Sequence, residues 1–465
     1  MAAPRFSIIA TRAWIDGGFR PAHVGIADGL ISEVIPLSSP YDPIGPPGEA
    51  TGPVFRLPDD TVLLPGLVDT HVHVNEPGRT EWEGFRSATL AAAAGGVTTI
   101  VDMPLNSIPP TTTAEALRIK RKAAVRKSYV DVGFWGGAVP ENLGSLGELR
   151  DAGVFGFKCF LSPSGVEEFG HLDADQLLRA MTEVAKLGSL LIVHAEDPAL
   201  LGDASALGAG YDGFLRSRPS ASEQSAVETV IDGVRRTGCR THILHLSNGR
   251  ALPSIRAAKR AGLPLTVETC PHYLTITAEE IPDGAGEFKC CPPIRDAKNR
   301  DLLWQGVRDG TIDAIVSDHS PSTVAMKRAA HGDFGLAWGG ISGLQLGLAA
   351  VWTEAWKRGI TLPEILPLFT TGPAKIAGIE GAGQLAAGRP AHLMVFGPDR
   401  PMIVDATELE HRNPITAYEG RTLAGRVLRT WLHGEDVFEA GGGYAPQPRR
   451  SPKGRLLSAS SPVPA

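Results

Sequence analysis

Short apolar stretches alternate with longer amphipathic stretches through most of this chain. From residue 63 to about 376, apolar runs that end at turn residues are followed by Ala-rich segments with helical spacing. The runs expected to be strands are 66–73, 97–103, 130–139, 153–161, 190–196, 241–247, 265–273 and 311–320. The helices expected between them include 81–94, 114–127, 174–187, 220–236 and 249–261. Strands that alternate with helices in this way predict parallel β-α-β units.

The number of these units predicts a closed barrel. Eight strand-plus-helix units over roughly 310 residues match the size and order of a (β/α)8 barrel. A doubly wound open sheet is the alternative, but no Gly-x-Gly-x-x-Gly motif follows the first strand. We therefore predict an α/β protein whose main domain, residues 63–380, is a TIM barrel.

Both ends of the chain have a different pattern, with short strand-like segments separated by turns. These segments are 6–13, 18–27 and 30–35, followed by a Pro/Gly-rich loop at 38–53, and then 391–396, 402–404 and 425–432 after the barrel. Because they flank the barrel, residues 1–62 and 381–440 are expected to pair into one small β-sandwich domain. Residues 441–465 are rich in Pro, Ser and Arg, which predicts a disordered tail.

Charge and cysteine content narrow the functional classes. The 465 residues include 45 Lys and Arg against 51 Asp and Glu, a formal net charge of −6 without long runs of one sign. This balance disfavours a nucleic-acid or membrane-surface partner. No apolar run reaches the roughly 20 residues of a spanning helix, and the first 20 residues lack a signal-peptide core. Five cysteines, two of them adjacent, indicate reduced thiols in a cytoplasmic protein.

The first predicted barrel strand ends in two histidines, His71 and His73. Residues i and i+2 of a strand lie on the same face, so both rings can bind one metal ion. Pro65-Gly66 begins this strand and Asn75-Glu-Pro-Gly78 ends it. The pair is therefore expected at the C-terminal end of the strand, where barrel enzymes keep their catalytic groups.

Four further ligand-type side chains are expected at the ends of later strands. Alternation makes His245 the inward, late residue of 241–247, while its neighbour His242 faces helices or solvent. Asp318 and His194 are late in their strands, and Lys158 shares a face with Gly156, which leaves room beside it. Each of these residues alone is more often an ordinary polar side chain than a ligand. Six together, at the ends of strands one, four, five, six and eight, favour a metal site.

Six ligands exceed the four of one tetrahedral zinc ion, so we predict two divalent ions. A lysine ammonium has only donors, but a buried lysine beside cations loses its proton readily. The neutral amine can react with carbon dioxide to a carbamate, whose two oxygens can bridge two ions. We assign His71, His73 and Asp318 to one ion and His194 and His245 to the other, with carbamylated Lys158 (N6-carboxylysine) and a hydroxide between them. Zinc is expected, with iron, manganese and cobalt as alternatives.

The motifs around these residues resemble those of the cyclic amidohydrolases of the amidohydrolase superfamily. They are Asp69-Thr-His-Val-His73, Gly153-x-x-Gly-Phe-Lys158, Val193-His-Ala-Glu196, His245-Leu-Ser247 and Ser317-Asp-His-Ser320. From residue 63 to about 432 the chain most resembles the allantoinases, with further motifs at 73–79, 102–106, 270–273, 291–295 and 337–341. The resemblance implies a metal-bridged carbamate on Lys158, hydrolysis of a five-membered cyclic ureide, and a homotetramer.

Departures from the related enzymes separate the possible substrates. Dihydroorotases have an arginine where this chain has Asn75, and dihydropyrimidinases and hydantoinases have a tyrosine at the position of Pro163. The Trp338-Gly-Gly340 loop also differs from their Gly-Val-Asn-Gly type loop. All three differences favour allantoin. Cys291, where many relatives have serine, and His392, where relatives usually have aspartate, depart from the family without an expected catalytic effect.

The expected reaction is the hydrolytic opening of allantoin to allantoate in purine and ureide catabolism. Asp318 is expected to take a proton from the attacking hydroxide and to pass it to the departing ring nitrogen. Substrate contacts are expected from loops after strands two, seven and eight, at Asn106, Cys291, Gly339 and Gly340, whereas His272 is expected to position a loop. Two alternatives stay open: a hydantoinase or dihydropyrimidinase acting on another cyclic ureide, and a non-catalytic assembly protein built on this scaffold.

Overall fold

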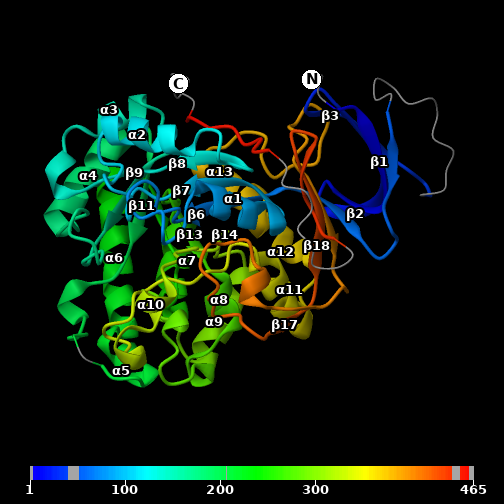
Figure 1. The fold of residues 1–465 in the computed structure, drawn as a ribbon. Helices are drawn as coiled ribbons and strands as arrows, with labels where there is room; N and C mark the ends of the chain where they lie inside the picture. Colours follow the sequence, from blue (N-terminus) through cyan, green and yellow to red (C-terminus); the bar gives the residue numbers. More distant parts are fainter. Residues whose placement is uncertain (1–3, 40–51, 206, 442–450, 460–465) are drawn as a thin grey trace.

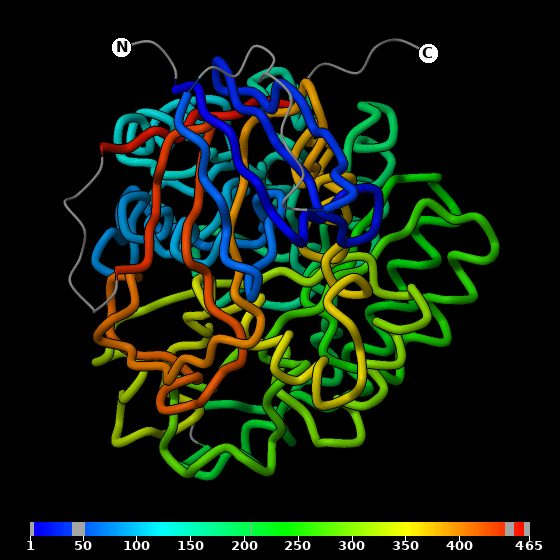
Figure 2. Tube along the Cα trace, turned by 90° about the vertical axis from the view of Figure 1, so that its right-hand side faces the viewer, coloured from blue at the N-terminus to red at the C-terminus, as the bar shows by residue number. Residues whose placement is uncertain are grey.

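A barrel of parallel strands surrounded by helices makes up the larger part of the molecule, with a sheet standing beside it (Figure 1). The structure is a computed structural model that describes residues 4–39, 52–205, 207–441 and 451–459. The N-terminal strands of the second sheet lie beside strands from the C-terminal part of the chain (Figure 2). The predicted fold, an α/β TIM barrel with a β-domain built from both chain ends, is confirmed.

The barrel strands follow one another in chain order. They are β6 (Leu67–Val72), β7 (Val97–Asp102), β8 (Asp131–Phe134), β9 (Gly136–Gly137), β10 (Phe157–Phe160), β11 (Leu190–His194), β12 (Arg240–Ile243), β13 (Leu265–Thr269) and β14 (Ala314–Ile315). The short segments β8 and β9 are two parts of the third strand. Parallel pairing runs from β6 to β8 and from β9 to β14, and a bridge between Val72 and His319 joins the two edges. The C-terminal ends of all eight strands therefore meet at one end of the barrel.

Helices cover the outside of the barrel. They are α1 (Phe85–Ala94), α2 (Ala114–Ala124), α3 (Leu146–Asp151), α4 (Ala174–Lys186), α5 (Tyr211–Ser217), α6 (Ser220–Thr237), α7 (Leu252–Arg260), α8 (Pro271–Thr275), α9 (Ala297–Arg308), α10 (Val324–Lys327), α11 (Gly347–Lys357), α12 (Leu362–Phe369) and α13 (Thr371–Ala377). In α4, Asp173 and Gln176 form a capping box, and Leu177, Met181 and Val184 bury one face. Among the described residues, no helix is long and apolar enough to cross a bilayer.

The β-domain combines strands from both ends of the chain. Its strands are β1 (Phe6–Ile15), β2 (Gly18–Ala27), β3 (Leu30–Pro36), β4 (Val54–Arg56), β5 (Val62–Pro65), β15 (Leu393–Gly397), β18 (Arg426–Leu432) and β19 (Glu435–Glu439). They pair in the order β19-β18-β15-β5-β1-β2-β3, with β4 also on β1, and a separate two-stranded sheet joins β16 (Met402–Ile403) to β17 (Thr422–Leu423). Apolar side chains from both ends, among them Ile8, Val24, Leu393 and Trp431, share one core.

The domain boundary lies slightly later than the sequence pattern suggests. Strand β5 pairs with β15 and β1, so its residues belong to the β-domain rather than to the barrel, which was expected to begin at residue 63. The chain passes into β6 at Gly66, where a side chain would lie 2.1 Å from Thr98 Oγ1. A continuous apolar run thus supplies strands to two different sheets, because glycine permits this close passage.

Part of the expected disordered tail is docked on the barrel. Leu456 forms a parallel bridge with Val132 of β8, and the backbone of Gly454 and Ala459 also bonds to the barrel. The prediction of disorder is therefore wrong for residues 451–459, while 442–450 and 460–465 lie outside the described residues. The composition of a segment does not show whether an unpaired strand edge elsewhere in the fold can bind it through backbone hydrogen bonds.

Candidate active site

The six predicted ligands lie together at the C-terminal end of the barrel. His71 lies in β6, Lys158 in β10 and His194 at the end of β11. The other three lie just beyond the ends of β6, β12 and β14, and they are His73, His245 and Asp318. All six side chains are buried. Position late in each apolar run therefore identified residues that the fold brings to one end, although His245 lies beyond the end of its strand.

Five of the six residues form two adjoining groups, and Lys158 is the sixth. Asp318 Oδ1 lies 3.1 Å from His71 Nε2 and 3.6 Å from His73 Nε2. In the second group, His194 Nδ1 lies 3.0 Å from His245 Nε2. The groups adjoin because the rings of His71 and His245 are 5.3 Å apart. The ligand atoms of His71, His245 and Asp318 also lie within 4.8 Å of one another, so the two groups are contiguous and the assignment of ligands to two separate ions stays a prediction.

The donor atoms fit bound cations. His71 Nδ1 donates to a carboxylate oxygen of Glu268 at 2.6 Å, so its Nε2 presents a lone pair toward Asp318. That Nε2 is buried and has no hydrogen-bond partner. His194 Nε2 likewise contacts Glu196 Oε2 at 2.8 Å, which leaves the Nδ1 lone pair facing His245. The buried His71 Nε2 without a partner is costly unless a cation or another donor satisfies it, and His194 Nδ1 can accept from His245 Nε2 at 3.0 Å or face a cation with it.

Burial sets the protonation of these groups. It lowers the pKa values of His71, His73, His194 and His245 well below that of free histidine, and the Lys158 charge contributes to each shift. Burial also lowers the pKa of Lys158 to about 8, although the nearby Asp318 carboxylate opposes this change. Neutral imidazoles bind cations, and a lysine with a lowered pKa more readily supplies the neutral amine from which a carbamate can form.

Glu268 is a site residue that the sequence interpretation missed. It lies in β13, and its Oε1 also accepts the backbone N–H of His245 at 3.2 Å. Its Oε2 pairs with His242 Nε2 at 2.9 Å. His242 is therefore buried against Glu268 and does not face solvent, since the neighbouring strand places a carboxylate beside it. The signal available in the sequence was a charged residue, this glutamate, inside the otherwise uncharged run 265–270.

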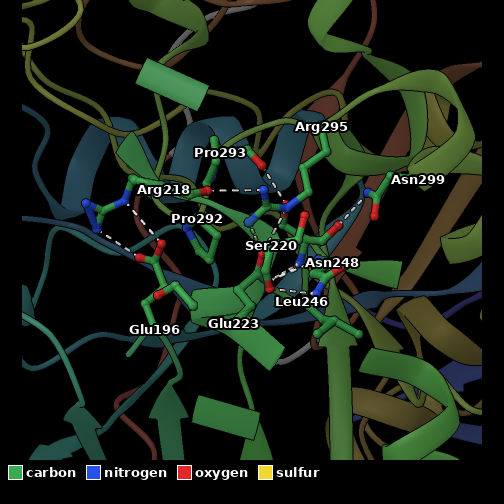
Figure 3. A network of polar contacts seen from close by, with 12 residues as sticks. Glu196, Arg218, Ser220, Glu223, Leu246, Asn248, Pro292, Pro293, Arg295 and Asn299 are labelled. Atoms are coloured by element: carbon green, nitrogen blue, oxygen red, sulfur yellow. Dashed lines mark hydrogen bonds and ion pairs between the residues drawn. The ribbon is translucent and has the colours of Figure 1, made fainter. Parts of the chain in front are cut away.

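A second missed element is an ion-pair network behind His194 (Figure 3). Arg218 forms two bonds to the Glu196 carboxylate, at 2.8 and 3.1 Å. Arg295 forms two bonds to Glu223, which also accepts the backbone N–H groups of residues 247 and 248. The Arg295 guanidinium joins the two pairs by donating to the Arg218 carbonyl at 3.2 Å. The network holds His194, the loop after β12 and the 291–295 segment in one arrangement.

Replacing Glu196 by glutamine is expected to weaken this arrangement. The amide would lose the ion pair with Arg218 and would no longer fix the proton on His194 Nε2, so we expect a loss of about 10–100-fold in metal affinity or kcat/KM. Metal content after dialysis and kcat/KM measure the effect. The exposed Glu228 of α6 gives a matched control, Glu228→Gln. Equal values for both variants would show that the network does not act on His194.

The predicted substrate contacts lie around the same end of the barrel. Asn106 Nδ2 lies 3.4 Å from His73 Nδ1, so this amide contacts a ligand histidine directly. A side chain on Gly339 would come within 4.0 Å of Cys291 Sγ. Gly340 has φ +113, and a side chain there would lie 2.0 Å from the carbonyl oxygen of Ser320. Close backbone approach beside Asp318 therefore requires glycine at residue 340.

His272 lies closer to the site than its expected role in a loop suggests. Its ligand atom, with those of Cys270 and Asp318, belongs to a group in which all three atoms lie within 4.8 Å of one another. The ring is buried, and Nε2 has no hydrogen-bond partner. Helix α8 therefore adds a neutral imidazole beside the ligand carboxylate, without displacing any of the six predicted ligands.

Comparison with known proteins agrees with this geometry. A family model described as "Amidohydrolase family" matches residues 62–437. The chain belongs to the amidohydrolase family. It is 54% identical over 452 residues to a protein named allantoinase from Streptomyces avermitilis, covering 97% of both chains. It is 45% identical over 393 residues to an allantoinase from Saccharomyces cerevisiae, covering 83% of this chain and 85% of the relative.

A solved structure supports the fold over nearly the whole chain. An L-hydantoinase (dihydropyrimidinase) from Arthrobacter aurescens superposes with a TM-score of 0.88 at 27% identity, covering 98% of this chain and 99% of that one. The predicted resemblance to cyclic amidohydrolases, and among them to allantoinases, is confirmed by these similarities.

Proposed function

We propose that this protein is an allantoinase, which opens the ring of allantoin hydrolytically to allantoate in purine and ureide catabolism. The observation that carries the proposal is the convergence of four histidines, a lysine and an aspartate at the C-terminal end of the barrel. The similarity to proteins named allantoinase supports the choice of substrate within the family. Retention of all six ligand positions argues against a non-catalytic assembly protein.

The proposed cofactor is a pair of divalent ions, with zinc expected first. His71, His73 and Asp318 would hold one ion, His194 and His245 the other, and a carbamate on Lys158 would join them. The unpartnered Nε2 of His71 and the 3.0 Å approach of His194 Nδ1 to His245 Nε2 fit such ions. When bound, the ions would lower the pKa of a shared water and polarise the ring carbonyl.

Asp318 is proposed to carry the proton that the reaction must move. Burial raises its pKa to about 7, even though the Lys158 charge opposes the shift, so the carboxyl group can gain and lose a proton near neutrality. The Ser320 hydroxyl donates to Asp318 Oδ1 at 2.7 Å and fixes the carboxyl orientation. The proton is taken from water and delivered to the departing ring nitrogen, because an amide nitrogen leaves poorly until it is protonated.

Substrate binding is proposed for the loops that carry Asn106, Cys291, Gly339 and Gly340. Gly340 is buried, its N–H donates to the Lys289 carbonyl at 2.7 Å and its carbonyl accepts from Lys327 Nζ, so it would shape the loop, whereas the partly exposed Gly339 is the glycine whose main chain is proposed to pair with the ureide. Beyond the small-molecule substrate we propose no nucleic-acid or membrane partner. By family resemblance the enzyme is proposed to be a cytoplasmic homotetramer.

The metal stoichiometry provides a first test. About two divalent ions per chain are expected, because six ligands with a bridging anion cannot all serve one tetrahedral centre. Elemental analysis of protein expressed with added zinc, manganese or cobalt measures this number. A reproducible value near zero in fully active protein would exclude the proposed mechanism.

A substrate panel tests the choice of ring. The kcat/KM for allantoin is expected to exceed that for unsubstituted hydantoin and dihydrouracil by at least roughly a hundredfold, because polar groups that bind the ureido arm are left unpaired by analogues that lack it. Asn75 cannot form the carboxylate clamp of dihydroorotases, and its amide already donates to the carbonyl of Pro321 at 3.2 Å. Allantoin, hydantoin, dihydrouracil and dihydroorotate are compared on metal-loaded enzyme. Faster opening of hydantoin or dihydrouracil would support the hydantoinase alternative.

A further inference from the structure

A second group of ligand-type side chains lies at the opposite end of the barrel. It consists of Asp131, the first residue of β8, with His392, which precedes β15, and His433, which lies in the turn between β18 and β19. One ligand atom from each residue lies within 4.8 Å of the others. Asp131 and His392 are buried, and His433 is partly exposed. The carboxylate comes from the barrel and both imidazoles come from the β-domain.

The three ligand atoms form a nearly regular triangle. His433 Nε2 lies 3.0 Å from Asp131 Oδ2 and 3.3 Å from His392 Nε2, and His392 Nε2 lies 3.6 Å from Asp131 Oδ2. Ligands at about 2.0–2.2 Å from a tetrahedral zinc ion stand about 3.3–3.6 Å from one another. Two sides of the triangle, 3.3 and 3.6 Å, fall in this range and the third, 3.0 Å, is shorter, so its size is close to one face of a zinc tetrahedron.

Hydrogen bonds account for the contact of His433 Nε2 with the two Asp131 oxygens, at 3.0 and 3.2 Å, but they account poorly for the position of His392. His392 Nε2 lies 3.3 Å from both ring nitrogens of His433, and the two rings meet at 75°, so Nε2 does not point at a single acceptor. His392 Nδ1 is buried without any hydrogen-bond partner. An imidazole pair that binds the same cation needs no hydrogen bond between its rings.

The carboxylate of Asp131 is held in place from its other side. Its Oδ1 accepts the backbone N–H of Arg455 at 2.8 Å and lies 3.2 Å from His433 Nε2, while Oδ2 lies 3.0 and 3.6 Å from the two histidines. Such an outer hydrogen bond is a common feature of metal-binding carboxylates, because it orients the ligating oxygen. The donor belongs to the docked segment 451–459, so three parts of the chain meet at this point.

We propose that Asp131, His392 and His433 bind one divalent transition-metal ion of the zinc type. Two imidazole nitrogens with one carboxylate oxygen select such an ion over magnesium or calcium, which prefer oxygen ligands. The partly exposed side of His433 leaves the fourth position to water. The ion is structural: it joins the β-domain and the segment 451–459 to the N-terminal end of the barrel, away from the catalytic end.

Metal analysis of full-length variants tests this site separately from the catalytic one. His392→Gln and His433→Gln are each expected to lose one zinc equivalent per chain while kcat stays within twofold of the unsubstituted enzyme. His71→Ala with His73→Ala should lose catalytic metal but keep this equivalent, so failure of the proposed function and failure of this site are distinguishable. The exposed His171 provides the control His171→Gln, for which no loss is expected.

Zinc-edge anomalous diffraction from the unsubstituted protein requires no variant. A peak within about 2.0–2.2 Å of His392 Nε2, His433 Nε2 and Asp131 Oδ2 is the expected result. A chelator should also lower the Tm of the unsubstituted protein more than that of His433→Gln. Unchanged zinc content in both glutamine variants, or no anomalous peak at this position in zinc-loaded crystals, would overturn the proposal.

Discussion

Replacing Lys158 by alanine is expected to abolish hydrolysis, and small carboxylic acids are expected to restore part of it. Lys158 is almost fully buried, and its charge influences all four ligand histidines. A methyl side chain cannot carry the carbamate, so two cations would lose the anion proposed to join them. Formate, acetate or propionate can occupy the space vacated by the side chain and offer two oxygens to the same ions. The measurements are kcat and metal content, with and without each acid.

A second buried lysine provides the control for this rescue. Lys120 is equally buried, but it pairs with Asp102 at 2.8 Å and donates to the carbonyl of Met103. Lys120→Ala is expected to reduce stability, and no carboxylic acid should restore what is lost, because the missing group is a cation. Full activity of Lys158→Ala without added acid would show that Lys158 is an ordinary buried lysine.

Asp318→Asn is expected to bind substrate and lose turnover. Asparagine keeps an oxygen for a metal ion but cannot accept a proton from water and return it to the leaving nitrogen. General acid–base catalysis contributes about 10²–10⁴-fold, so kcat should fall by at least that order. The substitution suits the backbone, because Asp318 has φ 43 and asparagine tolerates this left-handed region. Steady-state kinetics and metal content are measured together.

Another aspartate of the same β-α unit gives a matched control. Asp313 lies just before β14, at the opposite end from Asp318, and pairs with Lys259 at 2.7 Å. Asp313→Asn is expected to change stability and to leave kcat within about twofold, because it removes no group that could transfer the proton. A loss below tenfold in Asp318→Asn, with unchanged metal content, would place the proton transfer on another residue.

Local sequence pattern was sufficient for the barrel and for the ligands that lie inside it. The alternation of residues along a strand placed His71 and His73 on one face, and late position in each run placed both at the C-terminal end. Alternation failed for His245, because His242 is the residue that pairs with Glu268, and His245 lies beyond the end of β12 with φ 34. These inferences did not require the pairing order of the strands to be known. Parallel strands in a barrel direct all C-terminal ends to one side, so order along the chain was enough.

Partners that meet between strands depended on the tertiary structure. Glu268 reaches His71 because barrel closure brings β13 near β6, which are 197 residues apart at this contact. Arg218 and Arg295 reach Glu196 and Glu223 through loops whose paths the hydrophobic pattern does not specify. A long-range ion pair leaves no periodic pattern in the sequence. Each of its charged residues, taken alone, is equally typical of a loop exposed to solvent.

The sequence by itself determined the fold class and the family, and it predicted six residues that the structure brings to one end of the barrel, because these inferences depend on short-range periodicity and on contiguous motifs. Only the tertiary structure decided that Val62–Pro65 belongs to the β-domain sheet and that residues 451–459 pair with β8. It alone brought Asp131 together with His392 and His433. The physical reason is that register between distant strands is set by packing of the whole core and by backbone hydrogen bonds. A local run of residues carries no information about either.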